Sequence, residues 1–143
     1  MSKPDPKEVA RRLYEEVLND RNLAALDDLA VVDYVEHDPL PGQGTGLDGL
    51  KDRFTMLIDG LAPRFTIEDV IAEGDKVVVR WTNSGTHVGE FLGIPPTNKT
   101  FSIAGIDIYR LSGGKLAEHW HVVDVFGQLQ QLGLLPAPQG AGA

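Results

Sequence analysis

The fold is decided by the segment at residues 101–125, which reads FSIAGIDIYRLSGGKLAEHWHVVDV. Apolar and aromatic side chains dominate on both sides of Ser112-Gly113-Gly114-Lys115. A Gly-Gly pair between two such runs is typical of a β-hairpin turn. The segment therefore predicts two antiparallel strands, at residues 101–111 and 116–125, joined by a tight turn.

The elements before the hairpin separate into a helical half and a strand half. Residues 65–72 and 76–87 have strand composition and are joined by a turn at residues 73–75. Helices are predicted for residues 6–18, which follow the N-cap Asp5, for a short stretch near 23–29, and for 47–61. Residues 31–37 are an apolar segment, and residues 128–135 predict a short final turn. Helices followed by an antiparallel meander predict an α+β fold, with helices packed on one face of a curved antiparallel sheet.

Length and composition exclude several classes of protein. The chain has 143 residues, no cysteine, 13 basic and 21 acidic side chains, and a formal charge of −8. We expect a single domain over residues 1–143, with frayed ends at 1–4 and 137–143. A disulfide scaffold and a thiol nucleophile are excluded, and the acidic balance argues against binding of nucleic acid. With no apolar run of about 20 residues and no signal peptide, no membrane partner and a cytoplasmic location are expected.

The negative charge is concentrated in the helical half. Residues 1–75 hold 8 basic and 17 acidic side chains, whereas residues 76–143 hold 5 basic and 4 acidic ones. Those four are Glu90, Asp107, Glu118 and Asp124, and three of them lie in apolar surroundings. Desolvation raises the pKa of a carboxyl group, as a general base or acid near neutral pH requires. We therefore expect at least one functional carboxylate in the strand half.

The register of the hairpin decides which side chains share a face of the sheet. A two-residue turn at Gly113-Gly114 pairs Tyr109 with Glu118 and Asp107 with Trp120. One face then carries the following side chains: Asp107, Tyr109, Glu118, Trp120 and Asp124. The opposite face carries the two histidines of the second strand. A bulged turn would change this pairing across the hairpin.

The histidines and tryptophans allow more than one interpretation. His119 and His121 are spaced i, i+2 and could bind a metal with a third ligand nearby, although a surface pair is the favoured interpretation. His37 follows an apolar segment and could line the mouth of a pocket. Trp81 and Trp120 are expected in the core or in a pocket wall.

Four segments resemble the SnoaL-like polyketide cyclases, which belong to the nuclear transport factor 2-like superfamily. They are residues 34–39, 85–97, 105–110 and 118–133, and the resemblance extends from about Pro6 to Pro136. It implies a cone-shaped α+β fold with a deep pocket between sheet and helices. It also implies a homodimer packed through the outer face of the sheet, a hydrophobic small-molecule substrate, and no metal or other cofactor.

The resemblance further implies ring closure by intramolecular aldol condensation, with an aspartate as the base. By position this aspartate is Asp124, which would remove a proton α to an ester or ketone carbonyl. His37 is its expected partner, with His119 as a second choice. His37, Tyr34 or a protonated Asp107 would donate to the enolate oxygen. Residues expected to bind the substrate are Tyr34, Phe54, Trp81, Tyr109, His119 and Trp120.

Two other functions remain open at this point. An isomerase or epoxide hydrolase in the same fold is one, and hydrolysis would need Asp107, an arginine (Arg80 or Arg110) and Asp124 around a water. A non-catalytic, dimeric small-molecule-binding module is the other. The enzymes require a cavity with Asp124 in its wall, whereas the binding module predicts a filled core and an exposed or salt-bridged Asp124.

Overall fold

The computed structural model describes residues 4–136, so most of the ends expected to fray, residues 1–3 and 137–143, lie outside the described residues. The helical half and the strand half follow one another along the chain as predicted. In chain order the elements are α1 (Pro6–Arg12), the π-helical turn η1 (Leu13–Asn19), the 3₁₀ turn η2 (Leu23–Ala25), α2 (Leu26–Leu29), β1 (Ala30–Glu36), α3 (Gly46–Leu61), β2 (Arg64–Glu73), β3 (Lys76–Thr86), β4 (Thr100–Ser112), β5 (Lys115–Val123) and α4 (Val125–Gln131).

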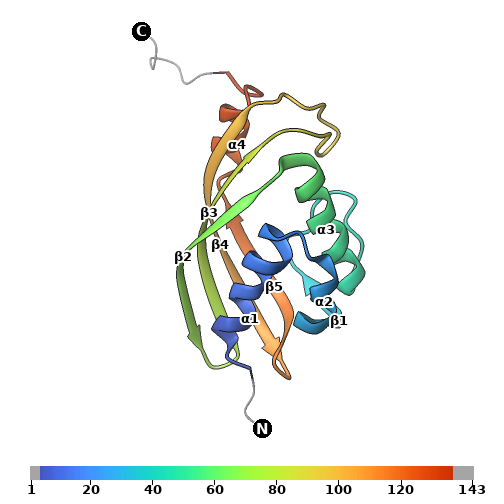
Figure 1. Cartoon of the computed structure of the whole chain (residues 1–143), viewed down its shortest axis with the longest axis vertical. Coiled ribbons are helices and arrows are strands. Elements are labelled where there is room, and N and C mark those ends of the chain that lie inside the picture. Colours follow the sequence, from blue (N-terminus) through green and yellow to red (C-terminus); the bar gives the residue numbers. More distant parts are fainter. Residues whose placement is uncertain (1–3, 137–143) are drawn as a thin grey trace.

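The strands form one curved, open five-stranded sheet in the order β1-β5-β4-β3-β2 (Figure 1). The meander from β2 to β5 is antiparallel as expected. The sheet as a whole is mixed, because β1 pairs in parallel with β5. A parallel pair needs a long connection between its strands, and here α3 and the first three strands of the meander lie between them.

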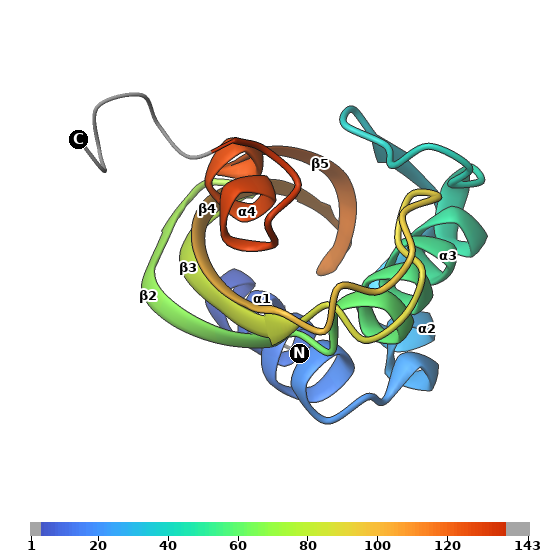
Figure 2. The same ribbon diagram turned by 90° about the horizontal axis from the view of Figure 1, so that it is seen from above.

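The helices cover the concave side of the sheet. Seen from above, the sheet curls into an arc whose open side is closed by α1, α2 and α3, while α4 lies at one end (Figure 2). Asp5 caps α1 as predicted, because its side chain accepts a hydrogen bond from the backbone N–H of Lys7 at 3.0 Å. The apolar stripe of α1 and η1 supplies much of the core: Val9, Ala10, Leu13, Tyr14, Val17 and Leu18.

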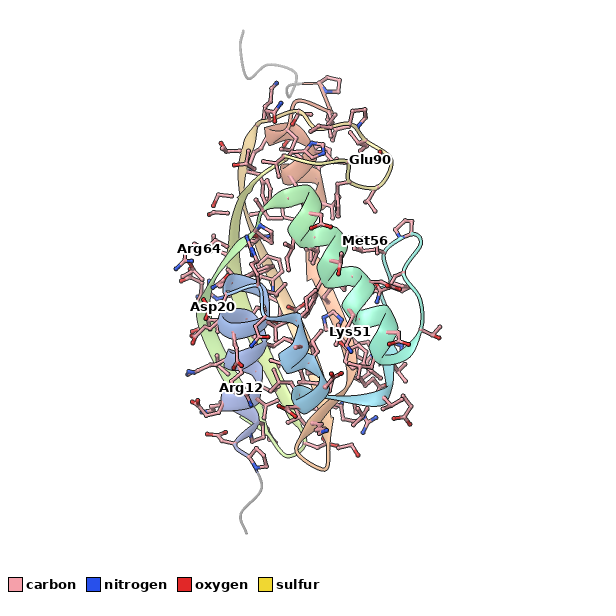
Figure 3. All side chains as sticks on the ribbon, turned by 45° about the vertical axis from the view of Figure 1, so that its right-hand side comes forward. Arg12, Asp20, Lys51, Met56, Arg64 and Glu90 are labelled. Atoms are coloured by element: carbon pink, nitrogen blue, oxygen red, sulfur yellow. The ribbon has the colours of Figure 1, made fainter. Side chains whose placement is uncertain are left out.

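The charged side chains of the helical half lie on the outer surface. Arg12, Asp20 and Lys51 all point away from the sheet (Figure 3). Among the described residues, none of the helices is long and apolar enough to cross a membrane.

The β4–β5 hairpin corrects the predicted register. The turn itself is as expected, with positive φ at both Gly113 and Gly114 and Ser112 paired with Lys115. Beyond Leu111 and Leu116, however, the register shifts by one residue, so that Arg110 pairs with Glu118. The extra residue is Ala117, and it forms a bulge.

This bulge exchanges the two faces of β5. Asp107 pairs with His121, and Tyr109 pairs with His119. The prediction that Asp107 and Tyr109 share a face with Glu118 and Trp120 is therefore wrong, because a shift of one residue moves every side chain beyond it to the other face. Both histidines of β5 thus lie beside Asp107 on the concave side.

Candidate active site

A cavity of about 180 Å³ lies between the concave face of the sheet and the helices. Most of its wall is apolar, with side chains from the helices, from the sheet and from the loop at residues 88–99. A few polar side chains also line it: Tyr14, Tyr34, Glu36, Arg53, Asn83, His87, Asp107, Tyr109, His119, His121 and Gln128. An apolar cavity with a few convergent polar groups is the usual form of a small-molecule site.

Asp107 is the buried carboxylate of this cavity, and it lies on β4 with 5% of its surface exposed. It accepts hydrogen bonds from Trp81 Nε1 at 2.7 Å, from His119 Nε2 at 2.9 Å and from the hydroxyl of Tyr14. Burial alone would raise the pKa of this carboxyl. The hydrogen bonds, chiefly from the two histidines of β5, outweigh burial and hold the pKa well below its ordinary value. Asp107 is therefore a persistent anion and a weak base.

His119 lies between two carboxylates. Its Nε2 contacts Asp107, and its Nδ1 lies 2.6 Å from Oε2 of Glu36, on β1. Burial favours the neutral ring, but the hydrogen bonds to Asp107 and Glu36 dominate and raise the pKa of His119 to about 9. At neutral pH both ring nitrogens therefore carry protons. His119 is a fixed cation, with no lone pair to accept a substrate proton.

Arg53 connects Glu36 to His121. This buried guanidinium, on α3, lies 3.5 Å from Oε1 of Glu36, and its Nη2 lies 3.0 Å from Nδ1 of His121. Because a guanidinium can only donate, Nδ1 of His121 accepts, and the ring hydrogen is on Nε2. The same Nδ1 lies 3.7 Å from Oδ1 of Asp107. His121 thus presents an unprotonated nitrogen between a cation and an anion.

Tyr34 offers a hydrogen bond that no protein group takes up. Burial raises the pKa of its hydroxyl well above the ordinary value, and the nearby charges of Glu36 and Asp107 add to the effect. The hydroxyl is therefore protonated at neutral pH. Among the described residues it has no hydrogen-bond partner, so it is free to donate to a ligand oxygen.

Most of the predicted site residues are brought together at the cavity. Those that line it are Tyr34, Phe54, Trp81, Asp107, Tyr109 and His119. His37 and Trp120 lie instead on the outer face of the sheet, where their rings stack with centroids 4.8 Å apart. Nε2 of His37 there lies 2.6 Å from Oε2 of Glu118. The bulge at Ala117 explains why Trp120 points outward.

Asp124, the predicted base, does not lie among the residues that line the cavity in the described part of the chain. It is exposed at the start of α4, where its side chain accepts a hydrogen bond from the backbone N–H of Gly127 at 2.9 Å. β5 ends at Val123, one residue earlier. Aspartate is among the preferred N-cap residues, so this position has a structural explanation.

The sequence gave little sign of the other polar residues at the cavity. Tyr14 belongs to the apolar stripe of the first helical segment and resembles a core residue. Glu36 and Arg53 carry no pattern that distinguishes them from surface charges. His121 was considered as half of a histidine pair, but the predicted register placed it on the opposite face from Asp107.

Asp107, His119 and His121 also meet the spacing of a metal site. Their ligand atoms all lie within 4.8 Å of one another. The guanidinium of Arg53 lies against His121, however, and three donors already occupy Asp107. Protons and a fixed cation therefore satisfy this cluster, and the donor set does not favour a divalent ion. The expectation of no metal and no cofactor stays a prediction.

Gly105 allows Trp81 to reach Asp107. A Cβ added at Gly105 would overlap the indole ring of Trp81. We expect Gly105→Ala to destabilise the folded state by about 1–3 kcal/mol, because the ring must move and its N–H leaves the carboxylate. Urea unfolding and tryptophan fluorescence measure both effects. Ala104→Ser, on the exposed neighbouring residue, is the control, and equal stability of the two variants would contradict this contact.

The fold and the site together define a class of protein: an α+β cone with a ligand-sized apolar cavity and a cluster of buried charged groups in its wall. The model of the SnoaL-like polyketide cyclase family matches residues 8–132. The chain belongs to this family, as the resemblance of its motifs predicted.

Known relatives agree with this assignment. The chain is 39% identical over 109 residues to aklanonic acid methyl ester cyclase DnrD of Streptomyces peucetius, covering 74% of this chain and 73% of the relative. It is 41% identical over 49 residues to nogalonic acid methyl ester cyclase of Streptomyces nogalater; this match spans 34% of this chain and only 37% of that protein. Among solved structures, TsrD of Streptomyces laurentii matches with a TM-score of 0.82 and 30% identity, over 90% of this chain and 94% of that one.

Proposed function

We propose that this protein is a cyclase that removes a proton α to a carbonyl of a polyketide-like ester and closes a ring by intramolecular aldol addition. The relatives are cyclases of such esters, which supports a small-molecule substrate of this kind. The observation that carries the proposal is the pair formed by Nδ1 of His121 and Nη2 of Arg53, 3.0 Å apart in the cavity wall.

This pair matches the shape of the reacting group. In an H–C–C=O unit the acidic hydrogen and the carbonyl oxygen lie close together, so base and oxygen donor must be neighbours. Nδ1 of His121 is unprotonated and can accept the hydrogen, while Arg53 donates to the oxygen on which negative charge develops. His121 is also the most open member of the group, with 19% of its side chain exposed, against 7% for Arg53 and Asp107.

The neighbouring residues stabilise charge without transferring the proton. Asp107 lies 3.7 Å from Nδ1 of His121 and compensates the imidazolium that forms there. The free hydroxyl of Tyr34 provides a second donor for the enolate oxygen. His119, held as a cation by two carboxylates, keeps the field at this end of the cavity positive.

The remaining step joins carbon to carbon. The enolate carbon attacks a second carbonyl of the same molecule, and the alkoxide formed takes back the proton from His121. No redox partner is needed, and the protein returns to its starting state. Because the step is intramolecular, holding the chain in a folded conformation supplies much of the acceleration.

The alternative functions are separated by contacts and by products. The relay proposed for epoxide hydrolysis is not assembled, because Arg80 pairs with Asp69 at 2.6 Å, Arg110 pairs with Glu118 at 2.7 Å, and Asp124 caps α4. An isomerase would use the same proton abstraction but would yield no new ring. A binding module would show no exchange of the α-hydrogen at all.

Solvent exchange and turnover of aklanonic acid methyl ester test the proposal. In D₂O the wild-type protein should catalyse exchange of the hydrogen α to the ester and form a cyclised product, followed by mass spectrometry. His121→Asn should slow both by about 10²-fold, the lower range for a general base. Asp124→Asn preserves a good N-cap and should retain most activity. Loss of activity in Asp124→Asn, with His121→Asn unaffected, would return the role of base to Asp124.

The other expectations stay predictions. Exposed apolar side chains on β1, β2, β4 and β5, among them Val32, Ile71, Ile106 and Val122, are consistent with a homodimer interface. The absence of nucleic-acid partners and the cytoplasmic location rest on the sequence alone.

A further inference from the structure

The cavity contains polar groups far from the acid–base cluster. Besides the hydroxyl of Tyr34, two of the buried side-chain atoms without a hydrogen-bond partner in residues 4–136 belong to residues that line it: Oδ1 of Asn83 and Nε2 of His87. Unsatisfied buried polar atoms are costly and rare, so each needs an explanation. Neither side chain has a role in the chemistry proposed above.

His87 offers a free donor. Its Nδ1 accepts a hydrogen bond from the backbone N–H of Thr97 at 3.2 Å, so the ring hydrogen is on Nε2. The residue is 1% exposed. The contact with Thr97 closes the neck of the loop at residues 88–99, which supplies Phe91, Leu92 and Ile94 to the cavity wall. That structural task explains Nδ1 and leaves the N–H at Nε2 unused.

Asn83 offers a free acceptor at the same end. It lies on β3, is 4% exposed, and pairs with Ile103 across the sheet. Asn83 and His87 are spaced i, i+4 along one extended segment, so both side chains point to the concave face. An asparagine on the concave face with no protein partner for its oxygen is unexpected where Val77, Val79 and Trp81 are the preceding residues on that face.

Register gives the separation between the two polar ends. Val79 is the partner of Asp107 in the β3–β4 pair. Asn83 lies four residues further along β3, which corresponds to about 13 Å at the rise of a strand, and His87 lies further still. The wall between them is largely apolar.

We propose that Asn83 and His87 form a second polar subsite that binds the far end of the ligand. It would take a group that both accepts and donates, such as a hydroxyl or phenol, or a carbonyl bound by His87 alone. The ligand class is thus an elongated, rigid, apolar molecule with oxygen functions at both ends. This inference rests on the proposed function for the identity of the reacting end, but binding at the far end can be measured without turnover.

Two biphenyls that differ in one oxygen test the subsite. The probes are 4,4′-dihydroxybiphenyl and 4-hydroxybiphenyl, with affinities measured by calorimetry. The wild-type protein should bind the dihydroxy probe about tenfold more tightly. Asn83→Leu, which is similar in size, and His87→Asn, which keeps an acceptor for Thr97, should each reduce this ratio towards one. His121→Asn should preserve the ratio while turnover is lost, so that a failure of the proposed chemistry can be distinguished from a failure of the subsite.

Stability separates ligand binding from a structural role. Removal of an unsatisfied buried amide should leave the melting temperature of the ligand-free Asn83→Leu variant unchanged or raise it. If Asn83 supports the fold instead, the melting temperature falls and the ratio of affinities stays as in the wild type. That result, or a wild-type protein that binds the two probes equally or binds neither, overturns the proposal.

Discussion

Asp107→Asn is expected to lower kcat/KM by about 10³-fold and to destabilise the folded protein by about 3–5 kcal/mol. The substitution keeps the shape of the side chain and an oxygen that can accept from Trp81 and Tyr14. It removes the negative charge that compensates an imidazolium at His121, and that charge is what the proposed proton transfer requires.

The loss of stability has a specific cause at His119. The asparagine NH₂ group would face the N–H on Nε2 of His119, which in the native protein contacts Asp107 at 2.9 Å. Two donors then meet in a buried position, and the ring must lose a proton or move. One of the two carboxylates that raise the pKa of His119 is gone, so this pKa falls. Urea unfolding measures the stability, and NMR titration of the ring follows His119.

Tyr14→Phe is the matched control. It removes one hydrogen bond from Asp107 and retains the charge, so kcat/KM should stay within about tenfold of the wild type. If Asp107→Asn folds and turns over at the native rate, Asp107 is a structural anion only. The proposed stabilisation of a His121 imidazolium would then be wrong.

Much of the fold could be predicted because its signals are local. The Gly113-Gly114 turn, the strand composition of residues 76–87 and the cap at Asp5 each depend on neighbouring residues, and each appears in the structure where expected. The parallel pairing of β1 with β5 is not local. It joins segments separated by α3 and most of the sheet, and residues 31–37 carried no pattern that announced it.

The composition of the site was harder to predict, because one inserted residue decides it. Ala117 has no feature that marks a bulge, yet it moves His119 and His121 to the side of Asp107 and turns Trp120 outward. Asp124 shows a related difficulty. Apolar neighbours in sequence suggested a buried strand position, but the strand ends at Val123 and the carboxylate caps a helix. Burial of a charge depends on where the chain leaves the sheet, and composition does not report that point.

The free energy of unfolding should decline between pH 6.5 and about 9, because His119 loses its proton over this range. The pKa of this imidazole is raised from 6.5 to about 9 by Asp107 and Glu36, against the effect of burial. A group whose pKa is higher in the folded state contributes its full stabilisation below the unfolded value, and the contribution is lost as pH rises through the folded value. The expected loss is on the order of 3 kcal/mol.

On the acidic side the sign is opposite. The pKa of Asp107 is lowered, so its contribution is present above the unfolded value of 3.8 and is lost only as pH falls well below it. Glu36 behaves in the same way, since His119 and Arg53 lower its pKa despite burial. The stabilisation from this cluster should therefore be greatest between about pH 4 and 6.5.

Urea unfolding at pH 6 and pH 9.5 checks the alkaline decline. His119→Gln lacks the titrating ring, so its stability should be lower at pH 6 and should change less between the two values. His37→Gln is the matched control, because it removes a histidine from the exposed outer face and should keep the native decline. If the wild type and His119→Gln instead lose stability in parallel, His119 is neutral in the folded protein. The cavity would then lack the fixed cation that the proposed chemistry uses to hold an enolate.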